Sequence, residues 1–199
     1  MKKLMTLMVA VVIMSMAVTA FAQPGSHDAG VFADPGAASS SIILPAFVPT
    51  FFYVLGYDMD GLVKGFEFLV QISDPAMTVL ARNLQAGALN VGSQDNFIVG
   101  AGGCFPGDGL WYQMVQYQAG YFVPTPPSDT LVCLGPSTPS SFAPAVPGYL
   151  QCDGSLVPFS VAQSGGGVYP DGCGVINATD PGQVISTTAE SFGAVKSKF

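Results

Sequence analysis

The residues that could do acid–base or nucleophilic chemistry are few and scattered. His27 is the only histidine, it lies in a segment rich in Gly, Ser and Asp, and no Gly-x-Ser-x-Gly motif is present. A Ser-His-Asp hydrolase is therefore not expected. A hydrolase with paired carboxylates is a lesser alternative, because a glycosidase requires only two acids at a suitable separation; the candidates are Asp58, Asp60, Glu67 and Asp108. We predict a non-enzymatic protein without catalytic residues.

No metal or cofactor is predicted either. The sequence Asp58-x-Asp60-Gly61 looks like the start of a calcium loop, but the rest of such a loop, including its glutamate, is missing. A turn capped by aspartate side chains explains the same residues.

Aromatic rings are the best candidates for ligand binding. In one continuous strand Trp111, Tyr117 and Tyr121 share a face, and a row of exposed rings could stack sugar rings. Because β-sandwich cores are built from the same residue types, core packing is the alternative interpretation.

Four cysteines, Cys104, Cys133, Cys152 and Cys173, lie in the second half of the chain. In an exported protein they predict two disulfides, for which three pairings exist. We favour Cys104–Cys133 with Cys152–Cys173, since each pair brackets a plausible hairpin or returning strand. A metal site is not favoured, because no Cys-x-x-Cys occurs and the histidine is distant in sequence.

Residues 1–22 have the parts of a cleaved signal peptide, namely Lys2-Lys3, the apolar run Leu4–Val18 and the small-x-small site Ala20-Phe21-Ala22. Cleavage leaves four of the 6 basic residues against 13 acidic ones, a net charge of −9. Nucleic acid is excluded as a partner, because its phosphates require a basic surface. We expect a secreted, extracellular or cell-envelope protein with no stable membrane span after cleavage.

The clearest structural pattern lies between Gly61 and Pro75. Every second residue is apolar, the set being Phe66, Phe68, Val70 and Ile72. This period of two predicts a strand with the apolar set in a core and Glu67 facing solvent.

Short apolar runs between 24 glycines and 16 prolines predict one all-β domain, a sandwich or a barrel, with about six to nine strands. Of the two we favour an antiparallel sandwich. We place the sandwich at residues 42–180. A flexible N-terminal segment, 23–41, precedes it and holds one possible edge strand at Val31–Ala33. A tail over 181–199 with a short helix follows, because Thr187 and Glu190 match a capping box.

Gly65-Phe66-Glu67-Phe68 runs on to Ser73-Asp74-Pro75 and then to Val79-Leu80. This order resembles a strand of cohesin-like β-sandwiches and their carbohydrate-binding relatives, which implies an Ig-like or cohesin-like fold. Cohesins normally lack four cysteines in this pattern, and no dockerin-binding face is evident, so dockerin binding is not carried over. The later cysteine layout resembles secreted Cys-containing proteins of environmental bacteria, which implies an extracellular or cell-envelope setting and no activity.

We therefore expect an exported, non-enzymatic β-sandwich that acts as a surface binding, adhesive or structural module. Its partner would be a protein or glycan at the cell surface. The alternative is a carbohydrate-binding module that uses Trp111, Tyr117 and Tyr121.

Overall fold

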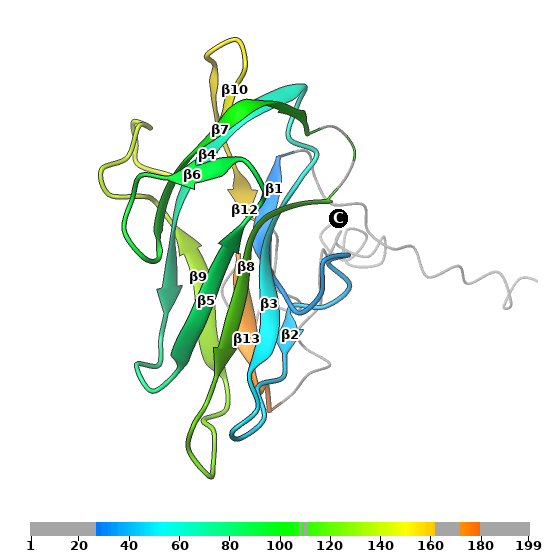
Figure 1. Ribbon diagram of the computed structural model, residues 1–199, viewed down its shortest axis with the longest axis vertical. Helices are drawn as coiled ribbons and strands as arrows, with labels where there is room; N and C mark the ends of the chain where they lie inside the picture. Colours follow the sequence, from blue (N-terminus) through cyan, green and yellow to red (C-terminus); the bar gives the residue numbers. More distant parts are fainter. Residues whose placement is uncertain (1–26, 108, 110, 162–171, 180–199) are drawn as a thin grey trace, which may run out of the picture.

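Two β-sheets packed face to face make up the protein (Figure 1). The computed structural model describes residues 27–107, 109, 111–161 and 172–179. The predicted signal peptide and the predicted C-terminal helix lie outside these residues. The regular elements of the described residues are all strands, most of them paired antiparallel, so the all-β class is confirmed. No helix of the described part is long and apolar enough to cross a membrane.

The described strands form one sheet of five and one of eight strands, more in total than the six to nine that the sequence predicted. In spatial order the first sheet contains β12 (Ser160–Val161), β1 (Asp28–Phe32), β3 (Thr50–Tyr57), β8 (Trp111–Gly120) and β5 (Thr78–Leu84). The second contains β11 (Leu156–Pro158), β10 (Gly148–Gln151), β4 (Leu62–Ile72), β9 (Thr130–Gly135), β13 (Cys173–Ile176) and β2 (Ser41–Ile42). β7 (Asn96–Pro106) also pairs with β4, and β6 (Ala88–Asn90) pairs with β7. Only β1 with β12 and β13 with β2 are parallel.

β4 is paired along both of its edges. β7 follows one edge from Leu62 to Leu69. The other edge is taken first by β9, whose Gly135 lies opposite Leu69, and then by β10, whose Gly148 lies opposite Glu67. β9 and β10 are thus two halves of one ladder, and residues 136–147 leave the sheet between them. We call this segment the Pro-rich loop.

The predicted alternation in β4 is confirmed on the core side. Phe66, Phe68 and Val70 are buried in the core between the sheets, and Ile72 is partly buried against it. The Phe68 ring packs against those of Phe66 and Phe97 at centroid distances of 5.5 and 5.1 Å. Burial of aromatic and β-branched residues on one face is what gives this strand its sequence pattern.

The prediction that Glu67 faces solvent was wrong, because the Pro-rich loop covers it. Glu67 does point away from the core, yet it is only 6% exposed. Its Oε1 accepts hydrogen bonds from Ser140 Oγ at 2.9 Å and from the Ser141 amide at 2.7 Å. The period of two gave the correct face, but it carries no information on a distant segment that folds back over that face.

The N-terminal strand also differs from its prediction. β1 lies between β12 and β3 and is therefore an inner strand of the first sheet, not an edge strand in a flexible segment. Ala29, Val31 and Phe32 are at most 1% exposed. The described domain therefore begins before residue 42.

The two disulfides are not the favoured pairs. Cys104 bonds to Cys152 and Cys133 bonds to Cys173, with Cα atoms 6.1 and 4.0 Å apart. Cys133 and Cys173 face one another on adjacent strands β9 and β13. Cys104 lies in β7 and Cys152 directly follows β10, the strands on opposite edges of β4, so their bond ties β4 between its neighbours. These bonds join strands that are adjacent in space rather than in sequence, and they are typical of an oxidising compartment.

Peptide mapping will test this pairing. Non-reducing proteolysis followed by mass spectrometry should yield a Cys104–Cys152 peptide and a Cys133–Cys173 peptide. Each bond closes a loop of 40 or 48 residues and should stabilise the fold by about 4 kcal/mol in the chain-entropy model. A Cys104–Cys133 peptide from the folded protein would contradict the arrangement of the sheets around β4.

Candidate functional site

The three predicted ligand-binding rings do not form one exposed row. β3 and β8 are in register up to Val54 opposite Val115, and the next pair is Leu55 opposite Gln113, so Met114 is an extra residue in β8. A β-bulge of this kind changes which side chains face the core. The prediction of a common face assumed a regular strand and was wrong.

Tyr117 and Tyr121 point into the protein and are 0% exposed. Trp111 lies before the bulge, where its ring contacts Phe32 and Tyr57, each at a centroid distance of 4.9 Å. It belongs to a small separate apolar cluster rather than to the main core. Two of the three rings are thus unavailable for stacking on a sugar. The carbohydrate-binding interpretation therefore lacks the row of exposed rings that it requires.

Tyr117 is instead part of a polar network that joins β8, β5 and the turn before β7. Its hydroxyl donates to Asp95 Oδ1 at 2.9 Å. Arg82 binds both oxygens of the same carboxylate at 2.7 and 2.8 Å, and it lies 5.8 Å from the Tyr117 ring centre. Burial, together with the negative charge of Asp95, raises the pKa of Tyr117. The hydrogen bond to Asp95 raises the pKa of Arg82. Such a paired network stabilises structure.

The remaining chemical candidates are engaged locally. His27 Nδ1 lies 2.7 Å from Tyr149 Oη, and His27 Nε2 lies 3.4 Å from Asp60 Oδ2. Asp58 accepts a hydrogen bond from the Gly109 amide at 2.7 Å. Burial raises the pKa of Tyr149 to about 12. Among the described residues no group of three or more His, Cys, Asp or Glu could hold a metal ion.

The candidate acids do not converge on Glu67. Asp58 and Asp60 lie in the turn before β4, whereas Glu67 lies five residues along that strand from Leu62, and the Leu62–Glu67 span is about 17 Å at the rise of a β-strand. Asp108 lies outside the described residues. Glu67 and the two aspartates of the turn therefore occupy different positions along β4.

A different feature is found on the outer face of the second sheet. The pairing places Leu156, Leu150, Gly65, Gly100 and Leu89 in one row across β11, β10, β4, β7 and β6. These strands lie together in the upper part of Figure 1. In the next row, the Val91 amide donates to the carbonyl oxygen of Ile98. We call Leu89, Val91, Ile98, Leu150 and Leu156, with the two glycines between them, the outer apolar face.

Three side chains of the outer apolar face are exposed, and those of Ile98 and Leu150 are partly buried. Leu89 is 67% exposed, Val91 is 70% exposed and Leu156 is 46% exposed. The first sheet has a different outer face, where Asn83 donates to Gln116, which donates in turn to Tyr53 Oη, at 3.1 and 3.4 Å. The first sheet also carries exposed apolar side chains beside this hydrogen-bonded polar ladder, Phe51 at 42% and Leu80 at 49%.

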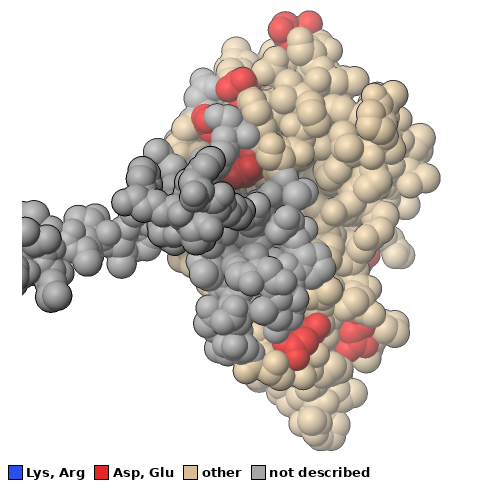
Figure 2. Space-filling view, turned by 180° about the vertical axis from the view of Figure 1, so that it is seen from behind, with Lys and Arg blue, Asp and Glu red and all other residues tan. Residues whose placement is uncertain are grey.

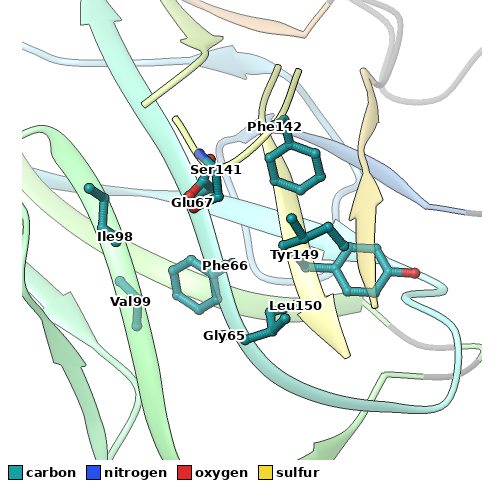
Figure 3. A pocket seen from close by; sticks show the side chains of 10 residues that line it. Gly65, Phe66, Glu67, Ile98, Val99, Ser141, Phe142, Tyr149 and Leu150 are labelled. Carbon is teal, nitrogen blue, oxygen red and sulfur yellow. The ribbon is translucent and has the colours of Figure 1, made fainter. Parts of the chain in front are cut away.

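The row contains a small pocket above Gly65. Its volume is about 120 Å³, and its lining includes Gly65, Glu67, Ile98, Phe142, Leu150 and Leu156. Figure 3 shows Glu67 and Ser141 side by side at one end, with Ile98 and Val99 on β7 along the wall. The Phe142 ring belongs to the Pro-rich loop and closes over Gly148, where a Cβ atom would clash with it. The sequence patterns did not indicate this pocket, because it depends on the path of the loop.

A second, wider depression of about 480 Å³ lies beside the Cys104–Cys152 bond and is lined by Asp60, Leu62, Gln151 and Asp153, among others. Figure 2 shows the protein from behind, with acidic side chains near the top and the bottom of the face in view.

The overall structure is similar to a non-cellulosomal cohesin from the hyperthermophilic archaeon Archaeoglobus fulgidus, with a TM-score of 0.44 and 11% identity, over 75% of this chain and 91% of that chain. The β-sandwich resembles a cohesin. No protein-family model matches the chain, and a search of curated proteins finds no match. The function has to be inferred from the surface of the chain itself.

Loss of the Tyr117–Asp95 hydrogen bond should lower the stability of the fold and leave the outer apolar face unchanged. Tyr117→Phe should lower the free energy of unfolding by about 1.5 kcal/mol, because it removes a hydrogen bond to a carboxylate. Tyr53→Phe is the matched control and should change it by less than about 0.5 kcal/mol, since the Tyr53 hydroxyl has only a 3.4 Å contact with Gln116. Urea denaturation measures both, and equal effects would contradict a structural role for the network.

The buried tyrosines also predict loss of stability at alkaline pH. Burial raises the pKa of Tyr112 and of Tyr149 to about 12, so folding favours the neutral phenols. The resulting stabilisation is complete below the unfolded-state pKa of about 10 and is lost as the pH rises toward 12. Urea denaturation between pH 9 and pH 11.5, with tyrosinate absorbance recorded in parallel, should show stability falling through this range. Full ionisation of all 7 tyrosines in a still-folded protein would contradict it.

Proposed function

We propose that the protein is an exported, non-enzymatic β-sandwich that binds a protein partner through the outer apolar face. The observation that supports this most is the row of Leu156, Leu150 and Leu89 around Gly65 and Gly100. Isolated surface leucines are common and need no explanation, whereas contiguous exposed apolar residues mark interaction surfaces.

Folding of the domain does not account for these side chains. The core-facing residues of the same strands, such as Tyr149 and Val99, are buried, so the strands already have one apolar face. A solvated outer face of an antiparallel sheet is normally polar. A partner that covers Leu89 and Val91 would remove their apolar side chains from water, which is favourable.

Export is supported by two independent features. Residues 1–22 have the sequence of a signal peptide. The described part of the chain holds two disulfides, which persist in an oxidising compartment. We infer that the mature protein works at the cell surface or beyond it, as a binding or adhesive module.

Paired variants on the two sheets test the proposal. Leu89→Ser with Val91→Ser changes the outer apolar face. Phe51→Ser with Leu80→Ser removes two apolar residues that are 42% and 49% exposed on the other sheet. Each immobilised protein is used to capture proteins from the cell-surface fraction of the source organism. We expect a partner that the unchanged protein and the Phe51/Leu80 variant retain and the Leu89/Val91 variant loses.

The variants must first be shown to be equally stable by thermal unfolding, as expected for exposed positions. Capture of the same partners by both variants would contradict binding through the outer apolar face. So would loss of the partner only from the Phe51/Leu80 variant, which would point to the first sheet.

A further inference from the structure

We propose that the pocket above Gly65 receives a lysine side chain of the protein partner. This inference rests on the proposed function and adds the chemistry of the residue that is recognised. It starts from Glu67, which supplies a carboxylate to a pocket that is otherwise mainly apolar.

Hydrogen-bond donors contact one carboxylate oxygen of Glu67, and none of the described cationic side chains forms an ion pair with it. Oε1 accepts from Ser140 Oγ and from the Ser141 amide, while Oε2 has no hydrogen bond within the described residues. The ion pairs found there are His27–Asp60 and Arg82–Asp95, and neither involves Glu67. A carboxylate in apolar surroundings is stabilised further when a cation reaches it. The pocket therefore contains a carboxylate without a cation beside it, and a ligand could supply that positive group.

The walls indicate what must carry that positive group. Ile98, Leu150, Leu156 and Phe142 all line the pocket. An unbranched aliphatic stem would lie against these residues, with a cationic head at Glu67. Lysine has this construction, four methylene groups ending in an ammonium with three donors.

Arginine fits less well for a geometric reason. The guanidinium binds a carboxylate best when both oxygens accept parallel hydrogen bonds. In Glu67, Oε1 already accepts two, from Ser140 and Ser141, which leaves Oε2 for a single contact. A compact ammonium requires no more than that.

The size of the pocket favours a side chain over a free small molecule. At about 120 Å³ it is close to cavities of ~150 Å³ that hold one benzene ring. Pockets for cofactors and drug-sized ligands measure about 300–1,000 Å³. The exposed residues around it, Leu89 and Val91 among them, would cover the rest of a protein surface.

The charge of the whole chain acts in the same direction. It carries 13 acidic and 6 basic residues, and Arg82, one of the described basic residues, is already bound to Asp95. An acidic protein attracts a basic partner and speeds their encounter. Glu67 would then select where on that partner a lysine is docked.

Methyl-resolved NMR titrations of the folded domain provide the test. The probes are N-acetyl-lysine-methylamide and N-acetyl-norleucine-methylamide, which has a similar apolar stem without the ammonium. We expect saturable shifts of the Ile98, Leu150 and Leu156 methyl groups with the lysine probe and about tenfold weaker binding of the norleucine probe, because the charge-assisted hydrogen bond is missing. Equal binding of both probes, or absence of shifts at these methyl groups up to the solubility limit, would overturn the proposal.

Two variants distinguish direct binding of the lysine by the Glu67 carboxylate from the hydrogen bonds by which that carboxylate positions the Pro-rich loop. Glu67→Gln should weaken the lysine probe about tenfold and leave the norleucine probe unchanged. Ser140→Ala removes a loop contact but keeps the carboxylate, and should retain lysine binding. If Glu67→Gln does not fold, the contrast between the two probes on the unchanged protein still decides. Partner capture that depends on Leu89 and Val91 without any lysine preference would leave the proposed function standing and reject this inference alone.

Discussion

The structure depends on the pairing of β4, which has neighbours along both edges for nearly its whole length. β7 takes one edge, and the other is shared by β9 and β10, which leave and rejoin the same ladder at Gly135 and Gly148. Because the backbone groups of a buried strand must all be paired, the chain has to return to β4 after the Pro-rich loop. Both ends of the Pro-rich loop are therefore fixed beside β4, and the middle of the loop is held over that strand.

Two polar contacts determine where the loop lies. Glu67 binds Ser140 and Ser141. Asn96 at the start of β7 exchanges two hydrogen bonds with the backbone of Thr138, at 2.7 and 2.8 Å. These contacts carry the loop across β4 toward β7 and bring Phe142 over Gly148. The pocket is thus a consequence of the sheet pairing together with the return of the loop, and the residue that anchors the loop is also the one that gives the pocket its charge.

The fold could be predicted from local patterns, and the site could not. The alternation of Phe66, Phe68 and Val70 gave the core strand correctly, since a period of two is a property of the strand itself. Burial of Glu67 depends on a segment some 70 residues away. The position of Trp111 depends on the bulge at Met114, and nothing in the one-dimensional pattern marks that residue. One disulfide joins the two neighbours of β4, and the other joins β9 to β13. Their pairing follows from the order of the strands in the sheet, which the alternation of apolar residues does not reveal.

The row of apolar residues on the outer face is the strongest argument that the second sheet has a role beyond stability. β6 has three residues, Ala88–Asn90, and pairs only with β7. Ala88 packs against the core, and Asn90 Oδ1 accepts from the amides of Gly92 and Ile98, so both contribute to folding. Leu89 lies between them, largely exposed and opposite Gly100. A polar residue at this position would serve the sheet equally well and would protect an edge strand against unwanted association. A leucine there, in a row with Leu150 and Leu156 and near the pocket that contains Glu67, is what the proposed interface with a partner requires.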